Sequence, residues 1–388
     1  MFERVFKFFS SLRLTVVCLA LAVVLVFLGT LAQVNEGLYL AQSRWFRSFF
    51  IWWEPAGAGF KVPVFPAGYL IGGVLLLNLI AAHLKRFKLT WKKAGINITH
   101  AGIILLLAGQ LATDMLSRET QVHFSEGETK NYAESSGRNE LVFLTDAADP
   151  KQDEVVSIPE SLVKNQGEIR SDKLPFTVRV KEYHINAALR PRGPMVDKGP
   201  PPASNGFGAG LVMTPAPETR STDERNMPSA ILELIGPQGS LGTWLVSTIM
   251  SQPQEFNLGN KIWRMAFRWQ REYLPYSIQL LKTTHDVYPG TDIPKNYQSR
   301  VRIENPARGE NREVDIYMNN PLRYQGLTYY QYQMPLQEGE GERPWSVLQV
   351  VRNPSWLTPY IGCIMVGGGM MIQFLMHLVG FISKRRTA

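Results

Sequence analysis

The most prominent pattern in this sequence is a set of four long apolar runs separated by more polar segments. A helix needs roughly 20 mainly apolar residues to cross a bilayer, and each run has about that length. The runs cover residues 14–32, 67–84, 96–116 and 357–382. The pattern therefore predicts four transmembrane helices, three in the first third of the chain and one near its end.

Basic residues gather at three places beside these runs. They are Arg4, Lys7 and Arg13 before the first run, Lys85, Arg86, Lys88, Lys92 and Lys93 between the second and third, and Lys384, Arg385 and Arg386 after the fourth. If all four runs cross, the three clusters lie on one side, which the positive-inside rule assigns to the cytoplasm. The sequence thus predicts a multi-pass membrane protein, with both termini cytoplasmic.

The first run could also be interpreted as a cleaved signal peptide, because it has a basic start and an apolar core. It is long for such a core, and Leu31, Ala32 and Gln33 make a poor cleavage site. We therefore expect a retained membrane anchor.

Residues 117–356 have the pattern of a large β domain on the extracytoplasmic (periplasmic) side. Segments 176–183, 277–281 and 299–303 alternate polar and apolar residues or are rich in β-formers, and Gly, Pro or Asn lie close by. The predicted fold class is a mixed membrane protein, with four transmembrane α-helices and a mostly-β extracytoplasmic domain inserted between the third and fourth spans. The expected domains are a first membrane part at 1–116, the β domain at 117–356, and the last span with its basic tail at 357–388.

Two parts of the β domain have an unusual composition. Residues 191–217 are dense in Pro and Gly and predict an exposed loop or a flexible insertion. Residues 317–332 are dense in tyrosine. These tyrosines either pack on the sheet, as aromatic residues commonly do, or form a docking surface for a polypeptide or a partner subunit.

Composition narrows the possible chemistry. The chain has 388 residues and only two cysteines, Cys18 and Cys363, both within apolar runs. It has no disulfide framework in the β domain and no Cys-x-x-Cys-His, so it is not itself a c-type cytochrome. Much of the net charge of +8 lies in the basic flanks. Such flanks favour the headgroups of a lipid bilayer as the partner, and no nucleic-acid partner is expected.

Three of the six histidines, His83, His100 and His377, lie in or at the ends of the predicted spans, in their cytoplasmic half. An ionisable residue there is a functional candidate, and imidazole is a common axial ligand of haem iron. His100 is the strongest candidate, because the apolar stretch 101–108 follows it; its alternative role is a hydrogen bond between helices. His83 and His377 could instead face lipid headgroups. His123, His184 and His285 are expected to be ordinary side chains of the β domain.

Gly95, Gly102 and Gly109 recur every seven residues in the third span. On a helix this spacing puts them on nearly one face, where small residues allow another helix to approach closely. His100 lies roughly 140° around the helix from Gly95. We therefore expect one face to pack on another span while His100 faces a second surface, hypothesised to be a haem cavity shared with a partner whose own histidine supplies the other ligand.

Several short motifs together resemble one family. In chain order they are Ser-Leu-Arg-Leu-Thr at 11–15, Leu-Gly-Thr-Leu-Ala-Gln at 28–33, Pro-Ala-Gly-Tyr-Leu-Ile-Gly at 66–72, Gly-Ile-Asn-Ile-Thr-His-Ala-Gly at 95–102, Asn-Pro-Leu-Arg-Tyr-Gln-Gly at 320–326 and Tyr-Gln at 330–331. Each is weak alone. The series, in a matching topology over nearly the whole chain, resembles the ResB (CcsB) family.

That resemblance implies a subunit of the System II cytochrome c synthase, which works with a multi-span ResC/CcsA-type partner. It also implies a bacterial inner (cytoplasmic) membrane as the location, although related proteins occur in plastids. The pair is expected to carry haem b, bound transiently, across the membrane and to present it for covalent attachment to apocytochrome c. This chain would be a non-catalytic or co-catalytic subunit of the haem lyase, with no catalytic residue of its own. The tryptophan-rich haem loop of the family belongs to the partner, and Trp52 and Trp53 lack the Gly and Asp of that motif.

The resemblance also favours His100 as the haem ligand, because the transmembrane histidine of the family matches the start of the third span. Since the chain ends after the fourth span, a separate partner is expected. The alternative function is a scaffold without haem, which would capture apocytochrome or a thiol-reducing partner for the ResC/CcsA-type subunit.

Overall fold

The structure, a computed structural model, describes residues 2–55, 59–88, 90–147, 152–193, 196–197, 199–219, 225–291, 293–335 and 343–387. The chain divides into two compact units. The helical unit contains Met1–Arg118, Arg220–Asp223 and Asn353–Ala388, and the β unit contains Glu119–Thr219 and Glu224–Arg352. Each unit is described by itself below.

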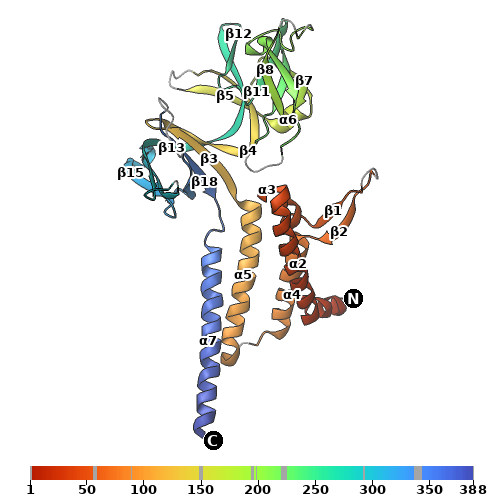
Figure 1. The fold of residues 1–388 in the computed structure, drawn as a ribbon, viewed down its shortest axis with the longest axis vertical. Helices are drawn as coiled ribbons and strands as arrows, with labels where there is room; N and C mark the ends of the chain where they lie inside the picture. Colours follow the sequence, from red (N-terminus) through yellow and green to blue (C-terminus); the bar gives the residue numbers. More distant parts are fainter. Residues whose placement is uncertain are drawn as a thin grey trace. The chain divides into compact units, whose positions relative to one another are not determined.

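Four helices of the helical unit are long and apolar enough to cross a membrane: α2 (Leu12–Glu36), α4 (Gly68–Arg86), α5 (Ala94–Leu116) and α7 (Thr358–Thr387) (Figure 1). Their positions confirm the four runs predicted from the sequence. The shorter elements are α1 (Phe2–Phe9), α3 (Leu38–Ala41), the π-helical turn η1 (Gln42–Phe46), β1 (Phe50–Trp53), β2 (Val62–Pro66) and the 3-10 turn η2 (Trp91–Lys93).

Helix α5 packs closely along α7 (Figure 1). A methyl group at Gly95 would come 2.6 Å from the carbonyl oxygen of Gly369, and one at Gly102 would come 3.0 Å from that of Gly362. A methyl group at Gly109 would collide with the side chain of Thr358. The seven-residue glycine repeat therefore forms a close helix–helix contact, as its spacing predicts.

Helix α2 packs on α4 around a buried amide. Asn78 of α4 is 1% exposed. Its Nδ2 donates to the carbonyl oxygens of Phe9 (2.6 Å) and Ser11 (3.0 Å), and its Oδ1 accepts from the Thr15 hydroxyl (2.6 Å). These carbonyls lie at the break between α1 and α2, where the helical hydrogen bonding is interrupted. One side chain thus satisfies the backbone at this break and joins it to α4.

The β unit is built mostly of strands, as predicted, and these strands pair antiparallel. They are β3 (Arg118–Ser125), β4 (Thr129–Asp146), β5 (Asp153–Pro159), β6 (Gly167–Ile169), β7 (Thr177–His184), β8 (Ala187–Pro191), β9 (Leu211–Pro215), β10 (Ser229–Gly236), β11 (Gly239–Ser247), β12 (Gln254–Leu258), β13 (Lys261–Val287), β14 (Pro294–Asn305), β15 (Glu310–Tyr317), β16 (Leu322–Tyr324), β17 (Leu327–Gln333) and β18 (Trp345–Arg352). Short helical segments are α6 (Glu160–Lys164), η3 (Phe207–Gly210) and η4 (Pro306–Arg308).

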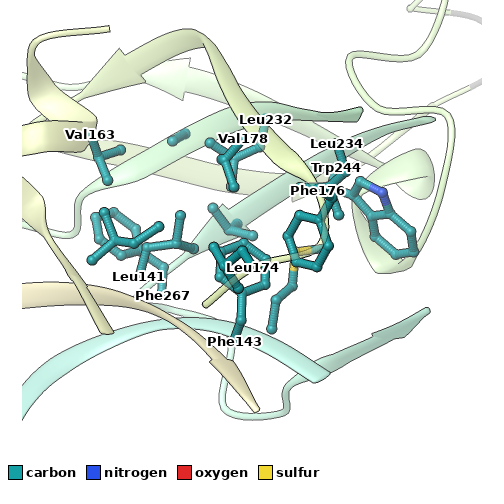
Figure 2. Packing of buried hydrophobic residues seen from close by; sticks show 14 of the residues in the cluster. Leu141, Phe143, Val163, Leu174, Phe176, Val178, Leu232, Leu234, Trp244 and Phe267 are labelled. Carbon is teal, nitrogen blue, oxygen red and sulfur yellow. The ribbon is translucent and has the colours of Figure 1, made fainter. Parts of the chain in front are cut away.

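The strands enclose two hydrophobic cores. The first lies between the sheet β11-β10-β7-β6 and the adjoining parts of β4, β5, β12 and β13. Figure 2 shows its packed side chains, among them Phe143, Phe176 and Leu232. The second lies within the curled sheet formed by β13 to β18 with β3 and β4. Both cores share the two longest strands, β4 and β13.

The Pro- and Gly-rich stretch at 191–217 is more ordered in its described part than the sequence predicts; residues 194, 195 and 198 lie outside the described residues. Strand β9 pairs with β8. Ala203 is fully buried and packs with Ile231 and Leu245 of the four-stranded sheet. The prolines and glycines in this stretch therefore shape a packed segment, and composition alone does not distinguish such a segment from a mobile loop.

Candidate functional site

The structure brings together two of the three histidines singled out in the spans. His83 lies on the last turns of α4, and His100 lies two turns into α5. Their imidazole rings are 6.0 Å apart between centroids, with an angle of 28° between the ring planes. Both side chains are half-buried. The short link between α4 and α5 places these two turns next to each other, so the pair is a consequence of the helical hairpin.

The hydrogen bonding of His100 assigns its protonation state. Its Nδ1 lies 2.8 Å from the carbonyl oxygen of Ile96, one turn earlier in α5. Because a carbonyl only accepts, Nδ1 carries a proton, and in the neutral imidazole the lone pair is then on Nε2. A ring fixed in this way by a backbone carbonyl is typical of histidines that bind metal through Nε2. In this state Nε2 of His100 is the nitrogen available to bind a metal ion.

His377 lies apart from this pair, on α7. Its side chain is exposed, and its Nε2 is 2.9 Å from Nε2 of Gln373, one turn earlier on the same helix. This imidazole nitrogen therefore already has a polar partner on its own helix. His377 is thus less suited to ligation than His100.

The histidine pair lies next to the most basic stretch of the helical unit. The end of α4 and the link that follows it carry five basic residues within ten residues of His83: Lys85, Arg86, Lys88, Lys92 and Lys93. Lys85 donates to the hydroxyl of Ser10 at 3.1 Å, and Asn97 donates to the backbone carbonyl of Lys88 at 3.2 Å. The backbone of the link is therefore fixed to α5 and one ammonium is directed toward the start of α2, while the other cationic side chains are exposed.

The opposite end of the α4–α5 hairpin is closed by an acidic residue that the sequence interpretation did not single out. Asp114 of α5 accepts from Arg47 Nε at 2.8 Å and from the hydroxyl of Tyr69, the second residue of α4. Its side chain is 13% exposed. An isolated carboxylate near the end of an apolar run was the available signal, since such a residue usually has a partner.

The three histidines of the β unit have structural environments. His184 pairs with Glu182 at 2.6 Å, and His285 stacks on Tyr297 with ring centroids 4.5 Å apart. His123 packs against Trp269, and burial lowers its pKa. These contacts fit the ordinary roles expected for all three.

The tyrosine-rich segment divides between the two roles considered. Tyr324 and Tyr329 are buried in the second core, where the hydroxyls of Tyr329 and Tyr276 are 2.6 Å apart. Tyr330 and Tyr332 are 39% and 56% exposed. The segment therefore contributes to the core and also presents aromatic side chains at the surface.

The helices and sheets define a multi-pass membrane protein with four candidate spans and a large antiparallel β unit. Comparison with known proteins then confirms the predicted family resemblance: residues 242–340, within the β unit, match the ResB-like family. The chain is also similar to Protein NrfI of Wolinella succinogenes, with 27% identity over 111 residues. This alignment covers 29% of the chain and 12% of the length of NrfI.

Proposed function

We propose that this protein is a haem-handling subunit of a cytochrome c synthase, with His100 as an axial ligand of haem b. The match to the ResB-like family implies a role in cytochrome c biogenesis. The single observation that carries the more specific proposal is the His83–His100 pair, with the proton of His100 held on Nδ1. His83 is then the candidate for a second imidazole from the same chain.

The donor set fits haem. Two imidazoles on neighbouring apolar helices suit an iron whose other four ligands belong to a macrocycle, whereas structural zinc sites use four protein ligands. Haem supplies the vinyl groups that become bonded to the cysteine thiols of an apocytochrome. The residues of this chain would bind and orient the haem: His100 would offer Nε2, and the Ile96 carbonyl fixes the ring.

The positive charges beside the histidine pair support an anionic ligand there. Haem carries two propionates, and the exposed ammonium and guanidinium groups of the α4–α5 link provide opposite charges beside the histidine pair. In the proposed orientation this link is cytoplasmic, by the positive-inside rule. The site would then receive haem from the cytoplasmic side, with a multi-span ResC/CcsA-type subunit as partner and apocytochrome c as the acceptor.

The test uses the full chain co-expressed with a ResC/CcsA-type partner and purified in detergent. Absorption spectra and the haem-to-protein ratio are compared for wild type, His100→Ala and His83→Ala. His377→Ala is the matched control within the spans, and His184→Ala is the control in the β unit. We expect His100→Ala to lose most of the low-spin Soret signal and to recover it when imidazole is added. Loss in His83→Ala as well would mean that both ligands belong to this chain, whereas loss in His100→Ala alone would assign the second ligand to the partner.

An unchanged haem content in both His100→Ala and His83→Ala would refute the haem proposal. It would favour the second candidate function, a scaffold that captures apocytochrome or a thiol-reducing partner. The observation behind this candidate is the pair of exposed tyrosines on β17, Tyr330 and Tyr332, which lie within the segment that matches the family. Replacing both by serine would then reduce apocytochrome binding without changing the absorption spectrum.

A further inference from the structure

The connection between α2 and α4 contains an aromatic two-stranded hairpin. Strand β1 pairs with β2 antiparallel, and the register shifts between Ile51 and Trp52. Ile51 is buried at 5% exposure, but the other large side chains are not. The exposed ones are Phe49 (61%), Phe50 (40%), Trp52 (49%), Trp53 (58%), Phe60 (59%), Val62 (37%) and Val64 (60%). Both faces of the hairpin are therefore apolar and uncovered beyond its base.

The charges of the hairpin do not offset this apolar surface. Glu54 and Lys61 lie across from each other beyond the paired residues, with 3.7 Å between the ammonium and a carboxylate oxygen. They form an exposed ion pair with no net charge. A soluble surface rarely gathers so many large apolar side chains without a partner, so the hairpin must have an apolar neighbour in the working protein.

The base of the hairpin is fixed to the start of α4. The Ala67 amide donates to the Phe49 carbonyl at 3.0 Å, and the Tyr69 amide donates to the Ser48 carbonyl at 3.1 Å. Gly68 lies so close to the backbone of Phe46 that a methyl group would collide there. The base of the hairpin thus lies at the first turn of α4, and the hairpin extends away from the helices (Figure 1).

We propose that the β1–β2 hairpin is an interfacial anchor, which lies in the lipid headgroup region at the end of the helical unit where α2 ends and α4 begins. Three observations point to lipid as the neighbour: continuity with membrane-spanning helices, aromatic side chains on both faces, and the absence of net charge at Glu54 and Lys61. Tryptophan is enriched at this depth because its ring is apolar and its N–H finds polar partners.

The backbone of the hairpin limits how deeply the hairpin can enter the bilayer. A two-stranded ribbon leaves the outer edge of each strand with unpaired amide and carbonyl groups, which the hydrocarbon core does not tolerate. Pro63 and Pro66 remove two of the donors in β2. The remaining groups need water or headgroups as partners. The hairpin therefore lies at the interface, with its side chains reaching into the acyl region.

The experiment measures immersion by spin labelling of the full chain in phosphatidylcholine/phosphatidylglycerol bilayers. In a Cys18→Ala, Cys363→Ala background, one cysteine is introduced at Trp53 or at Val64; the Val64 variant keeps both tryptophans. Control labels replace Val23, an exposed residue in the middle of α2, and Gln238, an exposed residue in the turn between β10 and β11. Each spin label collides with oxygen, which partitions into lipid, and with a nickel chelate, which stays in water. The ratio of the two collision rates gives the depth of the label in the bilayer.

We expect labels at 53 and 64 to collide with oxygen several-fold more, and with the chelate several-fold less, than the label at 238, and to lie shallower than the label at 23. Chelate access equal to that at 238 would place the hairpin in water and overturn the proposal. Shielding from both reagents would also overturn it, because a protein surface rather than lipid would then cover the hairpin.

Discussion

The glycine contact between α5 and α7 allows a sharp test, because α7 contains neighbouring glycines with opposite surroundings. A methyl group at position 369 would lie 2.7 Å from both the Gly95 carbonyl oxygen and the Thr99 amide nitrogen. A methyl group at position 368 would meet nothing within 4 Å. Gly369→Ala and Gly368→Ala are therefore the same chemical change on the same helix, one inside the contact and one outside it.

The expected magnitude follows from these distances. Ordinary contact begins at 3.4 Å, so the α5 backbone would have to retreat by about 0.7 Å, and overpacking of this kind costs about 1–3 kcal/mol. Both variants gain the same helix propensity, about 1 kcal/mol for alanine over glycine. Gly369→Ala should therefore be less stable than Gly368→Ala by about 1–3 kcal/mol, or roughly 2–12 °C in midpoint for a unit of this size.

The assay is the temperature at which half of the detergent-purified protein leaves the monodisperse size-exclusion peak. Wild type, Gly368→Ala and Gly367→Ala serve as the reference set, because neither control methyl group meets another atom within 4 Å. If Gly369→Ala is as stable as Gly368→Ala, then α5 and α7 are not in close contact in the membrane, and the argument from the glycine repeat fails.

Four further predictions concern polar groups that are buried or half-buried. Asn78→Ala removes three hydrogen bonds and leaves the Phe9 carbonyl without its partner, which should destabilise the helical unit by about 1–3 kcal/mol, read in the same thermal assay. Asp114→Asn removes the ion pair with Arg47 and should cost about 1 kcal/mol in that assay, with a smaller loss in high salt. Tyr329→Phe leaves the buried Tyr276 hydroxyl without its partner and should cost about 1–3 kcal/mol in chemical unfolding of the β unit. Because burial raises the pKa of both tyrosines, stability should fall as the pH rises above about 10, where the unfolded chain ionises first, and Tyr329→Phe should weaken that fall.

Each of these changes has a matched control at a more exposed position. Asn97→Ala, Glu54→Gln and Tyr330→Phe remove comparable groups and should shift stability by less than about 0.5 kcal/mol. Equal effects at the buried and the exposed positions would contradict the assigned hydrogen bonds. A pH profile of wild-type protein that stays flat above pH 10 would contradict the burial of the tyrosine pair.

Local features could be predicted from the sequence because they depend on short-range pattern. The four spans follow from length and hydropathy, and the packing face of α5 follows from the spacing of Gly95, Gly102 and Gly109. The orientation of His100 away from that face is also a matter of helix geometry. The neighbour of His100, which is His83, was not predictable from helix geometry. His83 belongs to another helix, so its proximity depends on how α4 and α5 pack and on the geometry of the link between them.

The division of the β unit into two cores depends on long-range pairing and could not be predicted. Strand β13 contributes Phe267 to the first core and Ile278 to the second. Between them its register with β4 shifts, around Pro275, and the pairing is interrupted. In the sequence this is an apolar strand pattern with a proline inside it, which ordinarily indicates the end of a strand. Here the proline lies where one continuous strand passes from one core to the other.

The contacts of the helical unit also bear on how a ligand could reach the histidine pair. Helix α5 is held against α7 by the glycine repeat, α4 is held against α2 by Asn78, and α4 meets α5 at the His83–His100 pair. At one end of these two helices Asp114 of α5 binds both Arg47 and Tyr69. At the other end lies the basic link, close to His83 and His100. Under the proposed function the haem propionates would face that basic link, and the orientation proposed from the positive-inside rule puts the link on the cytoplasmic side.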